Sequence, residues 1–363
     1  MATGQRGVPK CEIGSLKSEV GYGKSEVGSL KSEGFEPADF KLQTLISSGL
    51  VDWLLIVVPG VIWGASFLFI AEGLAAVSPN GVTFLRILIG FASLSLVPAA
   101  RRPILEADRT RAAALGVLWL AFPLSMFPFA EQHVSSALTG MLNGATPIFA
   151  AIVAGVVARR LPSPAMVTGL AVGVTGAALM AIPGFGAAAA ASGQTTGVLM
   201  ILAALISYGF AINLAGPLQQ RNGALPVIWR AQAVAVLLTA PFGAPAALNG
   251  TWSLRPALAL LALGALGTCV ANLVSATAAG RLGPTRASAS TFLMPVVALI
   301  LGVLVRGERV ALVSIAGAAV CLVGAALVRR ASADAAVKRA AATATQEAVA
   351  VSEAAYSRTT PAR

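Results

Sequence analysis

From Leu54 onward, the sequence alternates long apolar runs with short polar breaks. The runs lie near residues 54–75, 81–99, 112–131, 135–158, 164–183, 196–216, 224–243, 256–278, 285–305 and 310–328. Each is about 20 residues, enough to cross a hydrocarbon core of roughly 30 Å as a helix. Helices are required because backbone groups in lipid must be hydrogen-bonded within their own segment. The pattern predicts an all-α integral membrane protein of about ten transmembrane helices. The connections on either side of 135–158 are so short that a different number of helices stays open.

The overall composition supports a membrane protein. Of 363 residues, 56% are hydrophobic and 11% are charged, whereas an ordinary soluble domain carries about 25% charged residues. This difference argues against a soluble globular enzyme, a disordered protein or a nucleic-acid-binding module. The three cysteines (Cys11, Cys269 and Cys321) form no CxxC pair, and His133 is the only histidine. The sequence therefore indicates no metal site, no disulfide framework and no cofactor.

Positive charges gather on alternate loops. If the N-terminus is inside, the inner loops and the C-terminal flank carry Arg101, Arg102, Arg109, Arg111, Arg159, Arg160, Arg221, Arg281, Arg286, Arg329, Arg330, Lys338 and Arg339. The outer side carries only Arg255, Arg306 and Arg309. This asymmetry follows the positive-inside rule and predicts a multi-pass protein of the cell inner (plasma) membrane with both termini cytoplasmic. The net charge of +11 then orients the chain, and no nucleic-acid partner is needed.

Residues 1–50 differ from the rest of the chain. A seven-residue unit recurs three times between Gly14 and Gly34. Each unit begins with glycine, which costs about 1 kcal/mol in a helix interior, so disorder is expected rather than a coiled coil. The segment lacks the apolar core of a signal peptide. We interpret it as a disordered leader translated from upstream sequence, with the functional protein starting near residue 50.

The two halves of the apolar region share residues at one constant separation. Leu115-Gly116, Pro147, Gly169 and Gly176 recur as Leu263-Gly264, Pro295, Gly317 and Gly324. Arg86 and Arg230 occupy similar places in the second span of each half. Because five spans per half is an odd number, the second half enters the membrane from the opposite side, as in the inverted repeats of transporters. We predict a first five-helix repeat at 51–183, a second at 184–330 and a cytoplasmic tail at 331–363.

Several short stretches resemble a known family. The second half contains RASASTFLMPVVALILG from Arg286, then Arg306-Gly307-Glu308, then GAAVCLVG from Gly317; the first half contains WGASF from Trp63, Pro79, Arg86, and AEQ from Ala130 leading into Ser136–Pro147. These stretches are similar to the EamA family of the drug/metabolite transporter superfamily over residues 54–330. The resemblance implies ten helices in two inverted repeats around a central cavity open alternately to each side. It also implies transport of small metabolites, often amino acids or related compounds and frequently outward. One departure is that Arg160 stands in the first repeat where the second has Glu308.

Polar and aromatic residues inside the apolar runs are candidates for substrate binding. The predicted set is Trp63, Ser66, Asn143, Tyr208, Asn213, Gln232, Asn272 and Thr291. Interhelical hydrogen bonding is the alternative role for the amides, and anchoring at the membrane interface is the alternative for the two aromatic residues.

Prolines and charged residues in the spans are candidates for gating and coupling. Pro147 and Pro295 are predicted as mid-helix prolines that give either a static kink or a gating bend. Arg86 and Arg230 either snorkel to the interface or take part in function. Glu131, with Glu72 and His133, is a candidate for proton coupling, because desolvation raises the pKa of a carboxyl group.

These features together predict a secondary-active transporter, not an enzyme. We expect export of a small metabolite such as an amino acid by alternating access, driven by proton or exchange coupling, with the substrate and the lipid bilayer as partners. The alternatives are a membrane-embedded enzyme and a non-transporting membrane sensor. The enzyme is disfavoured because the sequence has no HExxH pair and no visible nucleophile with its base. Substrate, direction, coupling ion and oligomeric state stay open.

Overall fold

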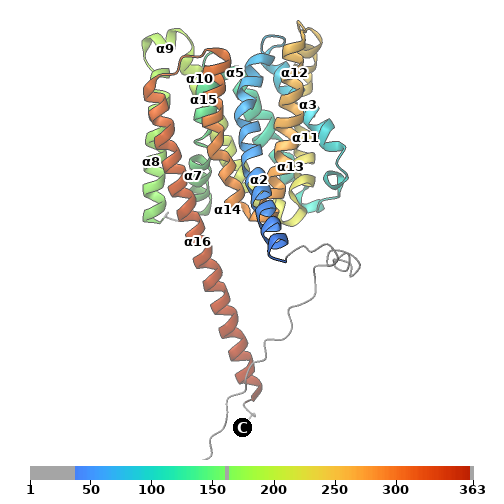
Figure 1. The fold of residues 1–363 in the computed structure, drawn as a ribbon, viewed down its shortest axis with the longest axis vertical. Coiled ribbons are helices and arrows are strands. Elements are labelled where there is room, and N and C mark those ends of the chain that lie inside the picture. The colour runs from blue at the N-terminus through green and yellow to red at the C-terminus, as the bar shows by residue number, and fades with distance from the viewer. Residues whose placement is uncertain (1–36, 160–162, 360–363) are drawn as a thin grey trace, which may run out of the picture. The chain divides into compact units, whose positions relative to one another are not determined.

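The computed structural model describes residues 37–159 and 163–359, which contain helices and no strands (Figure 1). The chain divides into two parts, Met1–Val51 and Asp52–Arg363, and the candidate site lies entirely in the second part. The predicted leader repeats, within residues 14–34, lie outside the described residues.

The first repeat consists of α2 (Pro37–Gly73), α3 (Pro79–Ser95), α4 (Arg109–Leu115), the π-helical segment η3 (Gly116–Ala121), α5 (Phe122–Ala130), α6 (Ser136–Asn143), α7 (Thr146–Ala158) and α8 (Pro164–Ala181). The second consists of α10 (Gln194–Asn222), α11 (Ala224–Leu248), α12 (Leu254–Ala262), the π-helical segment η5 (Leu263–Val270), α13 (Ala271–Leu282), α14 (Pro284–Ala287), the 3₁₀ segment η6 (Ser288–Phe292), α15 (Leu293–Arg306) and α16 (Leu312–Thr359). Short helices in the connections are η1 (Pro98–Arg101), η2 (Glu106–Asp108), η4 (Ile182–Gly184) and α9 (Ala187–Ala191).

The observed helices confirm the prediction of an all-α membrane protein. Within the described residues, 9 helical segments are long and apolar enough to cross a membrane. The remaining predicted span is α3, whose 17 residues extend about 25 Å at 1.5 Å per residue. Large apolar side chains such as Leu237 and Leu304 are exposed on the outside of the helices, as a lipid-facing surface requires.

Ion pairs at the helix ends show that the repeats are inverted. Asp52, near the start of the Leu50–Gly73 span of α2, contacts Arg281 at the end of α13. Glu72, near the end of α2, contacts Arg255 at the start of α12. Since α12 therefore begins where α2 ends, the third span of the second repeat runs opposite to the first span of the first repeat. Arg221, at the end of α10, contacts Asp108 just before α4, so the first helix of the second repeat runs opposite to the third span of the first.

The terminal parts of two helices extend beyond the predicted spans. Helix α2 begins at Pro37, so residues 37–50, predicted as disordered leader, are helical in the structure. Proline is favoured in the first turn of a helix, and no glycine follows it before Gly49. Helix α16 continues through the predicted tail to Thr359, which fits the strong helix propensity of its many alanines.

Glycines fix the close packing of α8 against α16, the last helices of the two repeats. A Cβ atom at Gly176 would overlap backbone atoms of Cys321, and a Cβ atom at Gly324 would overlap backbone atoms of Gly173. Backbones approach this closely only when small residues face each other. The glycines that repeat between the two halves therefore have a packing role.

The fourth span of each repeat is broken rather than kinked. Pro147 lies in the first turn of α7, after a turn at Gly144–Ala145, and Pro295 lies in the first turn of α15, after η6. The prediction that both prolines lie in the middle of a helix is therefore wrong, because each lies in the first turn of one. A proline in a first turn removes no helical hydrogen bond, because that N–H has no partner within the helix. The break in each span comes from the residues before the proline.

Candidate functional site

A cavity lies at the junction of the two repeats. It is lined by Trp63, Ser66, Phe67, Arg86, Trp119, Leu120, Leu124, Phe127, Asn143, Thr146, Tyr208, Ile212, Gly267, Thr268, Asn272, Thr291 and Met294. The cavity and its mouth contain about 850 Å³ of space free of protein atoms. Both repeats contribute polar and aromatic side chains, so a molecule in the cavity would touch each of them.

The two π-helical segments help to shape this cavity. Segments η3 and η5 begin at or next to the matching Leu-Gly pairs of the two repeats, and both contribute lining residues. In η5, the carbonyl of Gly267 accepts a hydrogen bond from the indole N–H of Trp63 at 3.1 Å. A π-helical turn is wider than an α-helical one and is frequent at functional sites. Here it leaves a backbone carbonyl available to a side chain from another helix.

Arg86 is the one charged residue among the cavity-lining side chains. It is 7% exposed, and its Nε donates a hydrogen bond to Thr268 Oγ1 at 3.3 Å. Within residues 37–159 and 163–359, no carboxylate lies within ion-pair distance of its guanidinium. A buried cation without a partner is costly in a membrane protein and marks a functional site. The cavity thus offers a positive charge to a bound anion.

An aromatic layer lines part of the cavity. The rings of Phe67 and Phe127 are 5.6 Å apart at an interplanar angle of 85°, and the rings of Phe127 and Tyr208 are 5.9 Å apart. These three residues come from α2, α5 and α10, so the layer again joins both repeats. We call Phe67, Phe127 and Tyr208 the aromatic layer.

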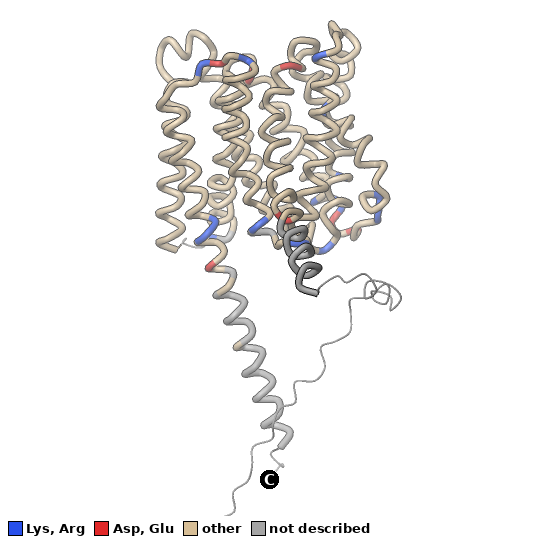
Figure 2. Tube along the Cα trace, in the orientation of Figure 1, with Lys and Arg blue, Asp and Glu red and all other residues tan. Residues whose placement is uncertain are grey.

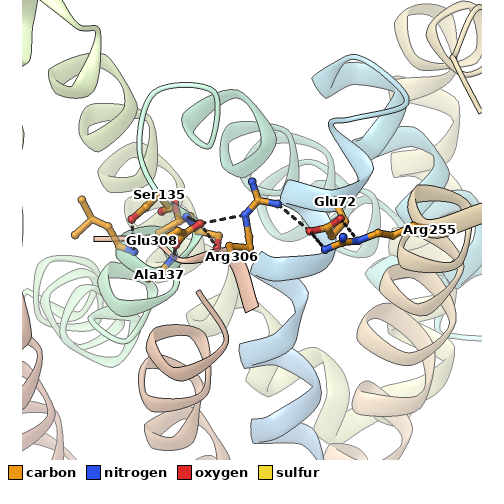
Figure 3. A network of polar contacts seen from close by, with 9 residues as sticks. Glu72, Ser135, Ala137, Arg255, Arg306 and Glu308 are labelled. Atoms are coloured by element: carbon orange, nitrogen blue, oxygen red, sulfur yellow. Dashed lines mark hydrogen bonds and ion pairs between the residues drawn. The ribbon is translucent and has the colours of Figure 1, made fainter. Parts of the chain in front are cut away.

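Beyond the aromatic layer, ion pairs connect α2, α12 and α15 at the end of the bundle (Figure 3). Glu72 contacts Arg255 at 2.7 Å and Arg306 at 2.9 Å, and Arg306 also contacts Glu308 at 3.3 Å. We call Glu72, Arg255, Arg306 and Glu308 the end network. The charge distribution along the sequence predicts that it lies on the outer side of the membrane (Figure 2).

Glu308 also caps a helix of the other repeat. Its carboxylate accepts hydrogen bonds from the N–H of Ser136 at 3.1 Å, from the hydroxyl of Ser136 at 2.8 Å and from the N–H of Ala137 at 2.8 Å. A carboxylate at this position satisfies free N–H groups and interacts favourably with the helix dipole of α6. Glu308 thus holds α6, in the fourth span of the first repeat, against the end of α15.

The cavity continues toward the opposite end of the bundle. A second cavity shares Thr146, Ile212 and Thr291 with it and extends to Arg329 and Ser332 on α16. The path therefore leads away from the end network.

The sequences of both repeats match a known family. The model of the EamA-like transporter family matches residues 52–182 and 195–330. This chain belongs to the EamA-like transporter family. The two matched stretches correspond to the two repeats that pack around the cavity, which confirms the family suggested by the sequence motifs.

Several relatives of this EamA-like transporter carry names that refer to transport. A "Probable terminal-alkyne amino-acid exporter" of Streptantibioticus cattleyicolor is 25% identical over 77% of this chain and 93% of the relative. The "Uncharacterized transporter YdfC" of Bacillus subtilis is 26% identical over 72% of this chain and 86% of the relative. The "Uncharacterized inner membrane transporter YedA" of Escherichia coli is 28% identical over 68% of this chain and 80% of the relative.

The EamA-like cavity contains many of the predicted site residues. Seven of them line it, namely Trp63, Ser66, Arg86, Asn143, Tyr208, Asn272 and Thr291. Pro147 lines the second cavity, and Pro295 packs against Gly144. Glu131 lies one turn beyond Phe127 and outside the cavity lining.

Of the other predicted residues of the EamA-like site, Asn213 lines the second cavity, whereas Gln232 and Arg230 line neither of the two cavities. Asn213 donates hydrogen bonds to the carbonyls of Ala150 and Gly209, and Gln232 donates one to the carbonyl of Thr268. These contacts match the alternative role of interhelical hydrogen bonding. Arg230 donates to the carbonyl of Pro226 and lies 5.5 Å from the ring of Trp229. It is therefore not the structural counterpart of Arg86.

Sequence reasoning missed the apolar part of the EamA-like site. Phe67, Trp119 and Phe127 are aromatic residues in apolar runs, where most such residues are structural. Thr268 carried a weak signal, since it is a hydroxyl next to a glycine inside an apolar run. Its role as the partner of Arg86 depends on a contact between α3 and η5, which no sequence spacing reveals.

Proposed function

We propose that this EamA-like transporter exports a small metabolite that carries a carboxylate, such as an amino acid or a related compound, by alternating access. The observation that carries the proposal is Arg86, a buried cation in the central cavity without an acidic partner in the described part of the chain. A substrate carboxylate would supply the missing charge through a bidentate pair with the guanidinium.

The rest of the cavity suits the remainder of such a molecule. Asn143, Asn272 and Thr291 offer amide and hydroxyl groups, which hydrogen-bond to a polar head. Trp63 and Trp119 offer aromatic faces to an apolar or cationic part of the substrate. The relative from Streptantibioticus cattleyicolor is named as an amino-acid exporter, which favours the same class of compound here.

The inverted repeats supply a route for alternating access. We infer that the contacts of the aromatic layer and the end network close one end, and that the path toward Arg329 leads to the other. An exchange of conformations between two oppositely inserted repeats would open the first end and close the second. With the predicted orientation, a substrate would enter from the cytoplasm and leave on the outside.

Transport by purified protein in proteoliposomes tests this function. We expect efflux of at least one amino acid or related carboxylate from a labelled panel. Arg86→Gln should reduce efflux about tenfold or more, since a buried charge pair is worth several kcal/mol, and Arg86→Lys should retain part of it. Arg230→Gln is the matched control and should keep near-normal efflux.

Substrate selectivity separates a binding role of Arg86 from a structural one. The unmodified protein should prefer an amino acid over its amide, which lacks the carboxylate charge. In Arg86→Gln, this preference should disappear while the thermal stability stays similar. No movement of any compound, or an unchanged preference in Arg86→Gln, would contradict the proposal.

A further inference from the structure

Glu131 has an unusual environment for an acidic side chain. It lies between two candidate spans, one ending at Ala130 and the next beginning at Ser136. Both of its carboxylate oxygens are buried, and neither has a hydrogen-bond partner within the described residues. An ionised carboxylate in such a place loses its hydration without compensation, at a penalty of several kcal/mol. The neutral, protonated form avoids this penalty.

The position of Glu131 connects the cavity to the end network. Its N–H donates to the carbonyl of Phe127 at 2.9 Å, so the two residues stand one turn apart on the same side of the chain. Phe127 belongs to the aromatic layer that lines the cavity. Glu131 therefore lies on the far side of this layer, between the layer and the end network.

Charged groups from other elements act on this carboxyl. Burial raises the pKa of Glu131 well above its ordinary value, Glu308 raises it further, and Arg306 and then Arg86 oppose the rise. The other titratable groups nearby are Glu72, which Arg306 and Arg255 hold, Tyr208 beside Phe127, and the exposed His133 near Gly193. Arg306 thus belongs to the end network and also interacts electrostatically with Glu131.

An ionised Glu131 would compete with Glu72 and Glu308 for Arg306. In the structure, Arg306 contacts both Glu72 and Glu308 and holds the end of α15 against α2. An ionised Glu131 would attract Arg306 and repel the Glu308 carboxylate, which caps α6. A protonated Glu131 leaves these contacts undisturbed. The closed end network and the protonated carboxyl therefore favour each other.

We propose that Glu131 is a proton-binding site, and that its proton holds the end network closed whereas loss of the proton opens it. The proposal rests on the proposed alternating access. The step breaks the O–H bond of the Glu131 carboxyl and transfers the proton to water that enters as this end opens. By linkage, a proton taken up from the open side drives closure. A low pH on the open side would then favour return of the empty transporter to the state in which the end network is closed.

The sign of the pH dependence follows from this coupling. The closed state binds the proton more tightly, so closure is favoured at low pH and loses its advantage as the pH rises through the raised pKa of Glu131. A buried residue between the two closing layers can report the change. Ile70 is suitable, because it is 0% exposed and lies one turn from Phe67 on α2.

The experiment measures modification of Ile70→Cys by a charged thiol reagent in nanodiscs, in protein whose Cys11, Cys269 and Cys321 are replaced by alanine. Because thiol reactivity itself rises with pH, each rate is divided by the rate for the unfolded protein at the same pH. We expect the normalised rate to increase at least about fivefold between low and high pH. In Glu131→Gln, which stays neutral, the rate should be low and independent of pH.

Two further variants make the result specific. His133→Gln removes the neighbouring titratable side chain and should keep the pH dependence, as should Glu131→Asp. Three results would overturn the proposal. They are an unchanged pH dependence in Glu131→Gln, a loss of the pH dependence in His133→Gln, and no pH dependence in the Ile70→Cys protein that keeps Glu131. If Glu131→Gln fails to fold, Glu131→Asp decides, with a shifted midpoint expected. No substrate is needed, so this result is separate from success or failure of the transport assay.

Discussion

At the scale of the residue, two charged side chains with opposite environments define the chemistry of the site. Arg86 is buried in the cavity and, within residues 37–159 and 163–359, donates to the hydroxyl of Thr268, whereas Glu308 accepts three hydrogen bonds from Ser136 and Ala137 and pairs with Arg306. The first has no acidic partner within ion-pair distance in the described part of the chain. The second is fully engaged and therefore structural.

Glu308→Gln tests this structural role. The amide keeps the shape of the side chain but loses its charge and part of its capacity to accept hydrogen bonds. We expect a loss of about 1–2 kcal/mol from the helix cap and its dipole interaction, observed as a lower thermal unfolding midpoint in detergent. Glu106→Gln is the control, since Glu106 is highly exposed in its pair with Arg109 and should change the midpoint little. Equal midpoints for the two variants would argue against the capping role.

At the scale of the element, the repeated glycines explain how the last helices of the repeats meet. Gly176 and Gly324 each face the backbone of the other helix at a distance that excludes a Cβ atom. The pair α8 and α16 therefore has little room to change its separation. A rigid pair at the edge of each repeat gives the other helices a fixed support.

Gly324→Ala should destabilise the protein despite the better helix propensity of alanine. The added methyl group overlaps the backbone of Gly173, and overpacking of this kind typically costs about 1–3 kcal/mol. Gly216→Ala is the matched control, because no atom lies near its Cβ position in α10, and alanine should stabilise that helix by up to about 1 kcal/mol. Thermal unfolding of both variants measures the difference, and a stabilising effect at Gly324 would contradict the close packing.

At the scale of the whole molecule, the end network joins parts of both repeats. Glu72 belongs to the first repeat, and Arg255, Arg306 and Glu308 belong to the second. Breaking these contacts should therefore favour the state in which this end is open. We expect the effect to act on a conformational equilibrium rather than on the polar residues of the cavity.

Arg306→Gln should increase the modification rate of Ile70→Cys at a pH where the unmodified network is closed. Arg306 makes two of the three ion pairs of the end network, and its loss removes the link between Glu72 and Glu308. Arg309→Gln is the control, because Arg309 is exposed on the same loop and is not part of the end network. A rate for Arg306→Gln equal to that of the control would show that the network does not hold the end closed.

Orientation in the membrane is a second prediction at this scale. The excess of arginines on alternate loops predicts cytoplasmic termini and an external loop around residues 184–195. Alkaline phosphatase, which is active only outside the cytoplasm, should be active when fused within this loop and inactive when fused after Arg363. Green fluorescent protein should give the opposite result at the C-terminus. Activity in the reverse pattern would also reverse the direction of the proposed transport.

The sequence by itself determined the membrane class, the spans and the inverted repeats, because hydrophobic length, charge asymmetry and glycine spacing act locally or along the chain. It also identified Arg86, since a charge inside an apolar run is conspicuous in any fold. Only the tertiary structure decided that Arg86 faces the cavity while Arg230 does not, that the prolines begin helices, and that Glu308 caps a helix of the other repeat. These facts depend on contacts between residues more than 100 positions apart, and the rotation of each helix about its axis, which sets those contacts, follows from packing against neighbouring helices.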